Sequence, residues 1–357
     1  MKRVALIAGL TVVAGLWATP AEAVTATQVV RCRSSNPTCW PTAFMFDPKG
    51  RAFYVERFTG KIRFRNLRTG RHRTWGRVRH VATGGERGAL GLALDPRWRS
   101  GRRYRNTRWV YVYYTHDQPL ENRILRLRKR RGGGFRRELL ARIPAGTNHN
   151  GGVIRFGPDR LLYGVTGDAG NPANSQSFTN LAGKVIRMTV TGATPSNNPV
   201  LGGARRRILS YGHRNSFGFT FDLETGRLWQ TENGPQCDDE LNLITGGGNY
   251  GWGPGSSCPN TSTVGTSPIA SKQAFTPVIA PTGAAFCKGC GLGVEGRLLF
   301  GSFNDGKIRA ATLNAARDGI TGVNDLFQHS RFILAMRRGR SGSVYFSDDR
   351  AVYRLDP

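Results

Sequence analysis

The chain has 357 residues, 39% of them hydrophobic, and carries 52 Lys and Arg against 23 Asp and Glu, a net charge of +29 at neutral pH. This length and apolar content suffice for a large buried core. The positive charge predicts adhesion to polyanions. Because no zinc finger, basic zipper or single-strand-binding signature accompanies it, we expect no specific nucleic-acid partner. An anionic cell-wall or surface polymer is the better candidate, beside the simpler interpretation of a solvated basic surface.

Residues 1–23 have the pattern of a signal peptide. Lys2 and Arg3 precede an apolar stretch at 4–17, and Ala21-Glu22-Ala23 is a small-residue cleavage site. An uncleaved membrane anchor is the alternative. No later stretch approaches the ~20 apolar residues of a membrane-spanning helix, so the protein is not expected to be transmembrane. We therefore expect residues 24–357 to form one domain that is secreted, periplasmic or displayed at the cell surface.

Short strands of alternating pattern, separated by Gly, Pro, Asn and Asp, fill the rest of the chain. One unit recurs about 45 to 65 residues apart: a strand, a tight turn, a second strand rich in Tyr, Phe and Val, and often a third strand. Its copies lie at 42–62, 91–125, 152–186, 219–244, 283–308 and 333–353. The pattern predicts an all-β, six-bladed β-propeller of four-stranded antiparallel blades. A parallel β-helix is disfavoured because its repeat is shorter, and residues 253–277 are predicted to be an inserted loop.

The 6 cysteines form three pairs that are close in sequence. Six cysteines allow fifteen connectivities, and we favour the local pairs Cys32–Cys39, Cys237–Cys258 and Cys287–Cys290. Such disulfides agree with an oxidising compartment. The C-x-x-C spacing at 287–290 leaves a zinc site as the alternative, although a second pair of this spacing is missing.

Three polar segments precede or follow predicted inner strands, whose starts converge on the central channel of a propeller. His149 lies in the first, where a histidine can act as a general base; a structural loop histidine is the alternative. Arg214 and Asn215 lie in the second, and the arginine either binds anionic ligand groups or satisfies strand-end carbonyls. The third, 231–252, concentrates carboxylates that suit calcium or that pair with local arginines.

These segments resemble the soluble PQQ-dependent glucose, aldose sugar and sorbosone dehydrogenases, whose propeller is shared with Hedgehog-interacting protein. The matching stretches, in order along nearly all of the mature chain, are 86–96, 110–115, 149–152, 162–168, 212–215 and 232–252. The resemblance implies a six-bladed propeller that binds pyrroloquinoline quinone (PQQ) over its channel, with calcium ions.

The resemblance also implies roles for single residues. His149 would take the proton of the sugar hydroxyl while hydride passes to the quinone. Arg214 and Asn215 would hold the quinone oxygens, with Glu86 close to the cofactor. The carboxylate of Glu240 and the carbonyl of Tyr250 would bind calcium.

The C-terminal third departs from the pattern of this family. The position of a cofactor-binding lysine is taken by Asn304, and an Arg-x-Arg pair is replaced by Phe332 and Leu334. Lys307 and Arg331 are near enough in sequence to substitute. Because PQQ bears three carboxylates and each charge-assisted contact contributes roughly 1.5–3 kcal/mol, losing three cations would weaken binding by several powers of ten.

Three functions follow as hypotheses. The first is an exported sugar dehydrogenase. The second is a propeller that has lost its cofactor and binds a carbohydrate, a cell-wall polymer or a protein. The third is a calcium-dependent lactonase-like hydrolase, which the sequence favours least because carboxylates are not spread over the inner strands.

Overall fold

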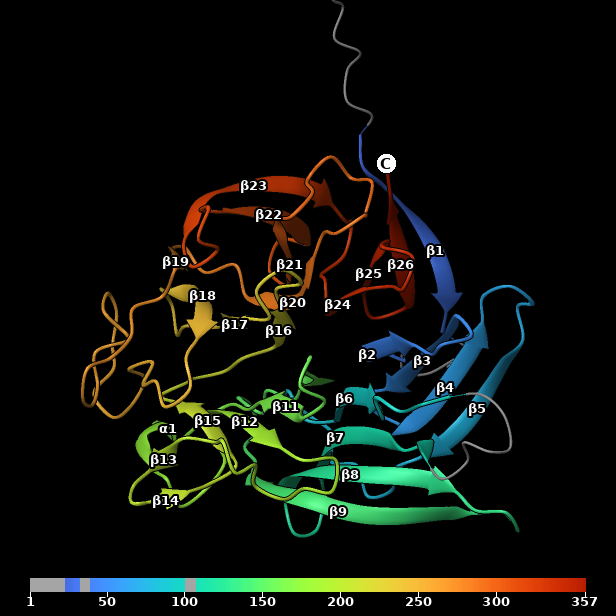
Figure 1. The fold of residues 1–357 in the computed structure, drawn as a ribbon, viewed down its shortest axis with the longest axis horizontal. Coiled ribbons are helices and arrows are strands. Elements are labelled where there is room, and N and C mark those ends of the chain that lie inside the picture. The colour runs from blue at the N-terminus through green and yellow to red at the C-terminus, as the bar shows by residue number, and fades with distance from the viewer. Residues whose placement is uncertain (1–22, 33–38, 100–106) are drawn as a thin grey trace, which may run out of the picture.

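The computed structural model describes residues 23–32, 39–99 and 107–357. Six four-stranded antiparallel sheets surround a central channel (Figure 1), which confirms the predicted six-bladed propeller. The predicted signal peptide lies almost entirely outside the described residues. Within them, no helix is both long and apolar enough to cross a membrane.

The first three blades follow one another along the chain. Blade 1 contains β2 (Pro41–Phe46), β3 (Arg51–Glu56), β4 (Lys61–Asn66) and β5 (His72–Arg77). Blade 2 contains β6 (Ala89–Leu94), β7 (Val110–His116), β8 (Glu121–Lys129) and β9 (Phe135–Pro144). Blade 3 contains β10 (Ile154–Phe156), β11 (Leu162–Val165), β12 (Lys184–Met188) and β15 (Ile208–Tyr211). The short helix α1 (Ala173–Gln176) and the hairpin of β13 (Val200–Leu201) and β14 (Ala204–Arg205) interrupt blade 3.

The other three blades complete the ring. Blade 4 contains β16 (Gly218–Phe221), β17 (Leu228–Glu232), β18 (Asp239–Ile244) and β19 (Gln273–Phe275). Blade 5 contains β20 (Pro281–Phe286), β21 (Leu298–Ser302), β22 (Lys307–Leu313) and β23 (Ile320–Gln328). Blade 6 contains β24 (Ala335–Arg338), β25 (Val344–Ser347), β26 (Ala351–Asp356) and β1 (Thr25–Arg31). The inserted loop predicted at 253–277 therefore ends in a strand, because 273–275 supplies the outer strand of blade 4.

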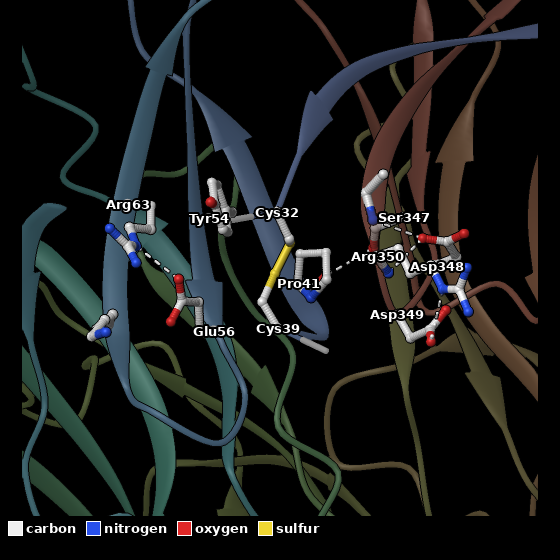
Figure 2. Close-up of a disulfide and its surroundings, with 12 residues drawn as sticks. Cys32, Cys39, Pro41, Tyr54, Glu56, Arg63, Ser347, Asp348, Asp349 and Arg350 are labelled. Atoms are coloured by element: carbon white, nitrogen blue, oxygen red, sulfur yellow. Dashed lines mark hydrogen bonds and ion pairs between the residues drawn. A yellow bond between two sulfur atoms is a disulfide. The ribbon is translucent and has the colours of Figure 1, made fainter. Parts of the chain in front are cut away.

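The ring is closed by strands from the two ends of the chain. β1 pairs antiparallel with β26, so residues near the N-terminus form the outer strand of blade 6. The Cys32–Cys39 disulfide links the end of β1 to the segment that enters blade 1 (Figure 2). Beside it, the hydroxyl of Ser347 donates a hydrogen bond to the carbonyl of Pro41 at 2.8 Å. The predicted pairs Cys237–Cys258 and Cys287–Cys290 also form disulfides, so the zinc alternative at 287–290 is wrong.

The hydrophobic core is divided among the interfaces between neighbouring blades. Phe53 of blade 1 packs with Val112 of blade 2, for example, and Trp229 of blade 4 packs with Phe300 of blade 5. Comparable buried clusters join the other neighbouring blades. Because both faces of every sheet are covered, the strands of each blade are held by its two neighbours. The loops that precede the inner strands β6, β10 and β16 are thereby fixed around one end of the channel.

Candidate active site

A histidine–aspartate pair lies at the entrance of blade 3. The Nδ1 atom of His149 is 2.8 Å from Oδ1 of Asp168, a carboxylate that is 1% exposed. Because a carboxylate only accepts hydrogen bonds, Nδ1 carries the proton and Nε2 of a neutral imidazole is left as the base. Asp168 is itself fixed, since its Oδ2 accepts a hydrogen bond of 2.8 Å from Nε1 of Trp252. The pair has the arrangement of an oriented general base.

The backbone of this loop packs too closely for larger residues. Gly151 has a φ of +58°, and a Cβ there would lie 2.8 Å from the backbone nitrogen of Gly167. His149 also has a positive φ, 56°, a conformation that is uncommon outside glycine. Such a backbone persists only where surrounding contacts hold it, and those contacts come from Glu86.

Glu86 connects the loops that enter three blades. Its Oε2 accepts hydrogen bonds from the backbone N–H of His149 at 2.6 Å and of Asn150 at 3.3 Å. The Nδ2 of Asn215 donates to both of its carboxylate oxygens at 3.2 Å. Glu86 therefore sets the relative positions of His149 and Asn215, and the structure brings these predicted site residues together.

Arg214 is held in place beside this pair. Its Nη1 donates to the carbonyl oxygens of Asn233 at 3.0 Å and Gly234 at 2.8 Å, and its guanidinium lies 5.3 Å from the ring of Trp252. Burial lowers the pKa of Arg214, and the charges of Asp168, Glu232 and Glu86 oppose this effect. Three buried polar atoms nearby have no partner among the described residues: Nε of Arg214, Oδ1 of Asn215 and Oδ1 of Asn233. Since buried polar groups are normally hydrogen-bonded, these atoms indicate a ligand site.

A cavity of about 340 Å³ is lined by residues that contact this group, whereas the side chains of His149, Arg214 and Asn215 lie behind its wall. Its wall contains Glu86 and Asn233 together with residues from every blade, among them Thr42, Leu90, Val153, Phe217, Thr282 and Leu334. The volume is in the range of small-molecule binding sites.

Arg57 is a cation in this wall that the sequence analysis did not single out. Its guanidinium lies 4.8 Å from the ring of Trp40, and it donates to the carbonyl oxygens of Arg87 at 3.0 Å and of Gly85. Burial lowers the pKa of Arg57, against the raising effect of Glu86. The side chain is 9% exposed and forms no ion pair shorter than 4 Å with the described residues, so it can offer charge to a ligand.

The blade 5 and blade 6 side of the cavity is apolar. Phe332 stacks on Phe303 with centroids 4.4 Å apart and lies 5.0 Å from Trp40, and Leu334 also lines the wall. The amide of Asn304 donates to the carbonyl of Val278 at 3.0 Å. No cation therefore stands at the three positions where the resemblance requires one.

The two possible substitutes are engaged elsewhere. The ammonium of Lys307 lies 2.6 Å from the carboxylate of Asp325. The guanidinium of Arg331 donates twice to Asp349 at 2.5 Å. Neither side chain is free to replace the missing cations.

Glu240 and Tyr250, the predicted calcium ligands, do not line the cavity. Glu240 accepts hydrogen bonds from Ser262 at 2.7 Å and Asn242 at 2.9 Å, and burial followed by the charge of Glu232 raises its pKa to about 8. The ring of Tyr250 stacks on His213, 4.7 Å between centroids. Among the described residues, the metal-like grouping of three side chains is Cys287, Cys290 and Glu295, whose cysteines form a disulfide. No cluster of three carboxylates, as a calcium-dependent lactonase would need, is found among the described residues.

His213 belongs to a buried hydrogen-bond network next to the site. Its Nδ1 lies 2.7 Å from Oε2 of Glu232, and its Nε2 lies 2.9 Å from the hydroxyl of Ser210. The other oxygen of Glu232 accepts the backbone N–H of Arg214 at 2.5 Å. This buried network positions the loop that carries Arg214 and Asn215.

Comparison with known proteins identifies the class to which this fold and site belong. The family model described as Glucose / Sorbosone dehydrogenase matches residues 37–355, and the chain belongs to this family. A similar curated protein is quinoprotein glucose dehydrogenase B of Acinetobacter calcoaceticus, 31% identical over 244 residues, which are 59% of this chain. The chain spans about half, 50%, of the length of that relative.

Two solved structures resemble this chain over most of its length. A putative oxidoreductase (glucose dehydrogenase) of Thermus thermophilus is 30% identical, with a TM-score of 0.79 over 93% of this chain and 100% of that one. The PQQ-bound aldose sugar dehydrogenase of Streptomyces coelicolor is 26% identical, with a TM-score of 0.76 over 95% of this chain and 99% of that one.

Proposed function

We propose that this chain is an exported sugar dehydrogenase of the quinoprotein type, which oxidises an aldose or a related sugar. The observation that carries the proposal is the imidazole of His149, oriented by buried Asp168 and held beside a ligand-sized cavity through Glu86. Membership of the Glucose / Sorbosone dehydrogenase family supports it.

The residues around the cavity fit PQQ, a flat quinone with three carboxylates. Trp40, Phe303 and Leu334 give an apolar wall for its rings, and Arg57 is a buried cation in this wall. Arg214, a half-buried cation, is held beside the cavity by Asn233, which lines it. The unpartnered Oδ1 of Asn233 and Nε of Arg214 are further polar contacts for it. The site offers two cations to the three carboxylates of PQQ. We therefore expect PQQ to bind more weakly here than in a site that also carries the lysine and the Arg-x-Arg pair.

The chain's own residues would bind the sugar and move its proton. When bound, PQQ accepts the hydride equivalent released from the sugar carbon. Nε2 of His149 takes the proton of the sugar hydroxyl, and the carboxylate of Asp168 stabilises the imidazolium that forms. Arg214 would supply positive charge to a quinone oxygen of the bound cofactor.

Calcium would be held apart from the cavity. Glu240 and Glu232 are buried carboxylates whose charges repel one another. Burial, with a smaller contribution from these two charges, also raises the pKa of Tyr250. A carboxylate and a backbone carbonyl are the donor types that Ca²⁺ takes, so Glu240 and the carbonyl of Tyr250 suit a structural ion.

The deciding experiment adds PQQ and calcium to the purified protein and measures dye reduction with a panel of aldoses. We expect activity with at least one aldose, and a loss of about 10²–10⁴-fold in kcat in His149→Ala. His80→Ala, at a histidine whose side chain is 67% exposed, is the matched control and should keep full activity. Absence of both PQQ binding and dye reduction in the wild type would refute the proposal.

A second candidate is a propeller of the same family that binds a carbohydrate, cell-wall polymer or protein without a cofactor. The apolar surface of Phe332 and Leu334 in place of cations favours it. Calorimetric titration separates the two candidates. Saturable micromolar binding of PQQ that is lost in Arg214→Ala supports the dehydrogenase, and binding of an oligosaccharide alone supports the second candidate.

Export and surface attachment complete the proposal. The signal-peptide pattern at 1–23 and three disulfides agree with an oxidising compartment. The charge of +29 favours attachment to an anionic cell-wall or surface polymer. Retention on such a polymer should fall steeply with salt, because exposed charges are screened.

A further inference from the structure

Two arginines enter the central channel from opposite sides of the ring. Arg155 belongs to β10, the inner strand of blade 3, and Arg337 belongs to β24, the inner strand of blade 6. Blades 3 and 6 face each other across the channel (Figure 1). Nη2 of Arg155 donates a hydrogen bond of 2.7 Å to the carbonyl of Met336, next to Arg337. The side chain of Arg155 therefore crosses the channel.

Both arginines line a small cavity of about 20 Å³. Thr42, Val153 and Phe217 line this cavity and also the larger one of the candidate active site, so the two are neighbours along the channel. The remaining wall is largely apolar, with Leu92, Ile154 and Ala335 among its residues. About 10–15 Å³ is enough for one water-sized occupant, so the cavity has room for a single small particle.

The two guanidinium groups have no negative partner among the described residues. Neither forms a salt bridge there, whereas Arg317 and Arg331 each bind an aspartate at 2.7 Å or less. Nε of Arg155 is buried and has no hydrogen-bond partner in the described chain. The remaining described contact of Arg155 is with the ring of Phe219, 5.7 Å from its Cζ.

The surroundings penalise both positive charges. Burial, followed by the charge of Arg337, holds the pKa of Arg155 well below its usual value, and burial lowers the pKa of Arg337 to about 10. Arginine nevertheless stays charged at neutral pH. Both side chains are half-buried, and Nε of Arg155 is fully covered. A charge that has lost part of its hydration is stabilised by a partner of opposite sign. A negative occupant between the two groups would supply the missing partner.

We propose that Arg155 and Arg337 form a binding site for one small monovalent anion of the halide class, with chloride as the natural occupant. The small volume favours a monatomic ion over tetrahedral sulfate or phosphate. The apolar wall strengthens the attraction by keeping the local dielectric low. This site is separate from the proposed dehydrogenase chemistry and does not depend on it.

The test uses the full mature chain without cofactor. Thermal unfolding is followed while chloride or bromide replaces gluconate at constant ionic strength, so that general screening is unchanged. We expect a saturable rise in Tm with either halide and none with gluconate. Crystals grown in bromide should show an anomalous peak between the two guanidinium groups.

Arg337→Gln is the informative variant, because the Arg337 side chain makes no described hydrogen bond or ion pair that the change would break. It should lose the saturable rise in Tm and the anomalous peak. Arg338→Gln is the matched control on the same strand, where the side chain donates to the carbonyl of Lys288 at 2.8 Å, and it should keep both. Equal effects of chloride and gluconate, or wild-type crystals with no bromide in the channel, would overturn the proposal. Sulfate or ordered water in place of bromide would also overturn it.

Discussion

The carboxylate of Asp168 accepts three hydrogen bonds from three different parts of the chain. They come from Nδ1 of His149, Nε1 of Trp252 at 2.8 Å and the backbone N–H of Gly170 at 2.7 Å. With its oxygens so occupied, Asp168 cannot turn away from the imidazole. In the proposed mechanism it would position His149 and stabilise the positive charge that proton transfer creates.

Replacing this carboxylate by an amide tests that role. In Asp168→Asn we expect kcat for sugar oxidation to fall by about 10²–10⁴-fold, because the amide no longer fixes the tautomer of His149 or stabilises its positive form. The affinity for PQQ, measured by calorimetry on the same preparation, should change by less than about tenfold. Equal losses in kcat and in PQQ affinity would instead indicate a collapsed site.

Restoring a missing cation tests the apolar side of the cavity. Leu334 lines the cavity at a position where the related dehydrogenases are expected to carry arginine. In Leu334→Arg we expect PQQ to bind about 10- to 100-fold more tightly, since one charge-assisted contact contributes roughly 1.5–3 kcal/mol.

The matched control is Leu223→Arg, at a leucine that is 46% exposed. It adds the same charge to the surface and should leave PQQ affinity unchanged. If both variants gain affinity equally, the effect is one of net charge and not of the cavity.

Among the elements, β1 and β2 join the first and last blades next to the candidate site. The backbone N–H of Trp40 donates to the backbone carbonyl of Asp349 at 3.0 Å, and that of Cys32 donates to the backbone carbonyl of Arg350 at 2.9 Å. Trp40 then lines the active-site cavity. Closure of the ring and the shape of the cavity therefore depend on the same short segment.

Breaking the closing disulfide tests this coupling. In the double variant Cys32→Ser, Cys39→Ser we expect the free energy of unfolding to fall by about 2–3 kcal/mol, as for a disulfide that closes a short loop. Urea denaturation of the purified protein measures it. The variant Cys287→Ser, Cys290→Ser removes a disulfide within blade 5 and is the control for the cavity. It should leave the affinity for PQQ unchanged, whereas loss of the Cys32–Cys39 disulfide should lower that affinity. Unchanged PQQ affinity in both variants would show that the cavity does not depend on the closing disulfide.

For the whole molecule, one buried amine makes stability depend on pH. Lys184 is 0% exposed, and its ammonium donates to the carbonyls of Asn174 at 2.5 Å, Ser175 at 3.0 Å and Ala182 at 2.7 Å. Burial lowers its pKa from 10.5 to about 7. Between these two values the unfolded chain binds one more proton than the folded chain, so stability rises as pH rises.

We therefore expect the free energy of unfolding to increase from pH 7 toward pH 10, by at most about 1.4 kcal/mol per pH unit from this group. Lys184→Met should flatten that slope, while also lowering stability because the carbonyls that the amine contacts lose their donor. Lys49→Met, at an exposed turn, should keep the slope. Chemical denaturation at a series of pH values measures all three, and an unchanged slope in Lys184→Met would contradict the assignment.

The sequence by itself determined the number of blades, the disulfide pairs and the loops that meet at the channel. Strand periodicity and turn residues are local properties. The cysteines lie in three pairs that are close in sequence, which favoured local pairing among the fifteen possible connectivities. His149, Arg214 and Asn215 were found for the same reason, since each stands just before an inner strand, whereas Glu86 was indicated only by the resemblance to the sugar dehydrogenases.

The tertiary structure alone decided which residues complete the site. Asp168 contacts His149 only because the end of β11 packs under the loop that enters β10. Arg57 and Trp40 reach the cavity because the ring closes, and Arg155 meets Arg337 because blades 3 and 6 lie opposite one another. Lys307 and Arg331 were excluded as substitutes by their aspartate partners. Contacts of this kind join residues that are distant in sequence, and a local sequence pattern does not predict how close such residues lie in space.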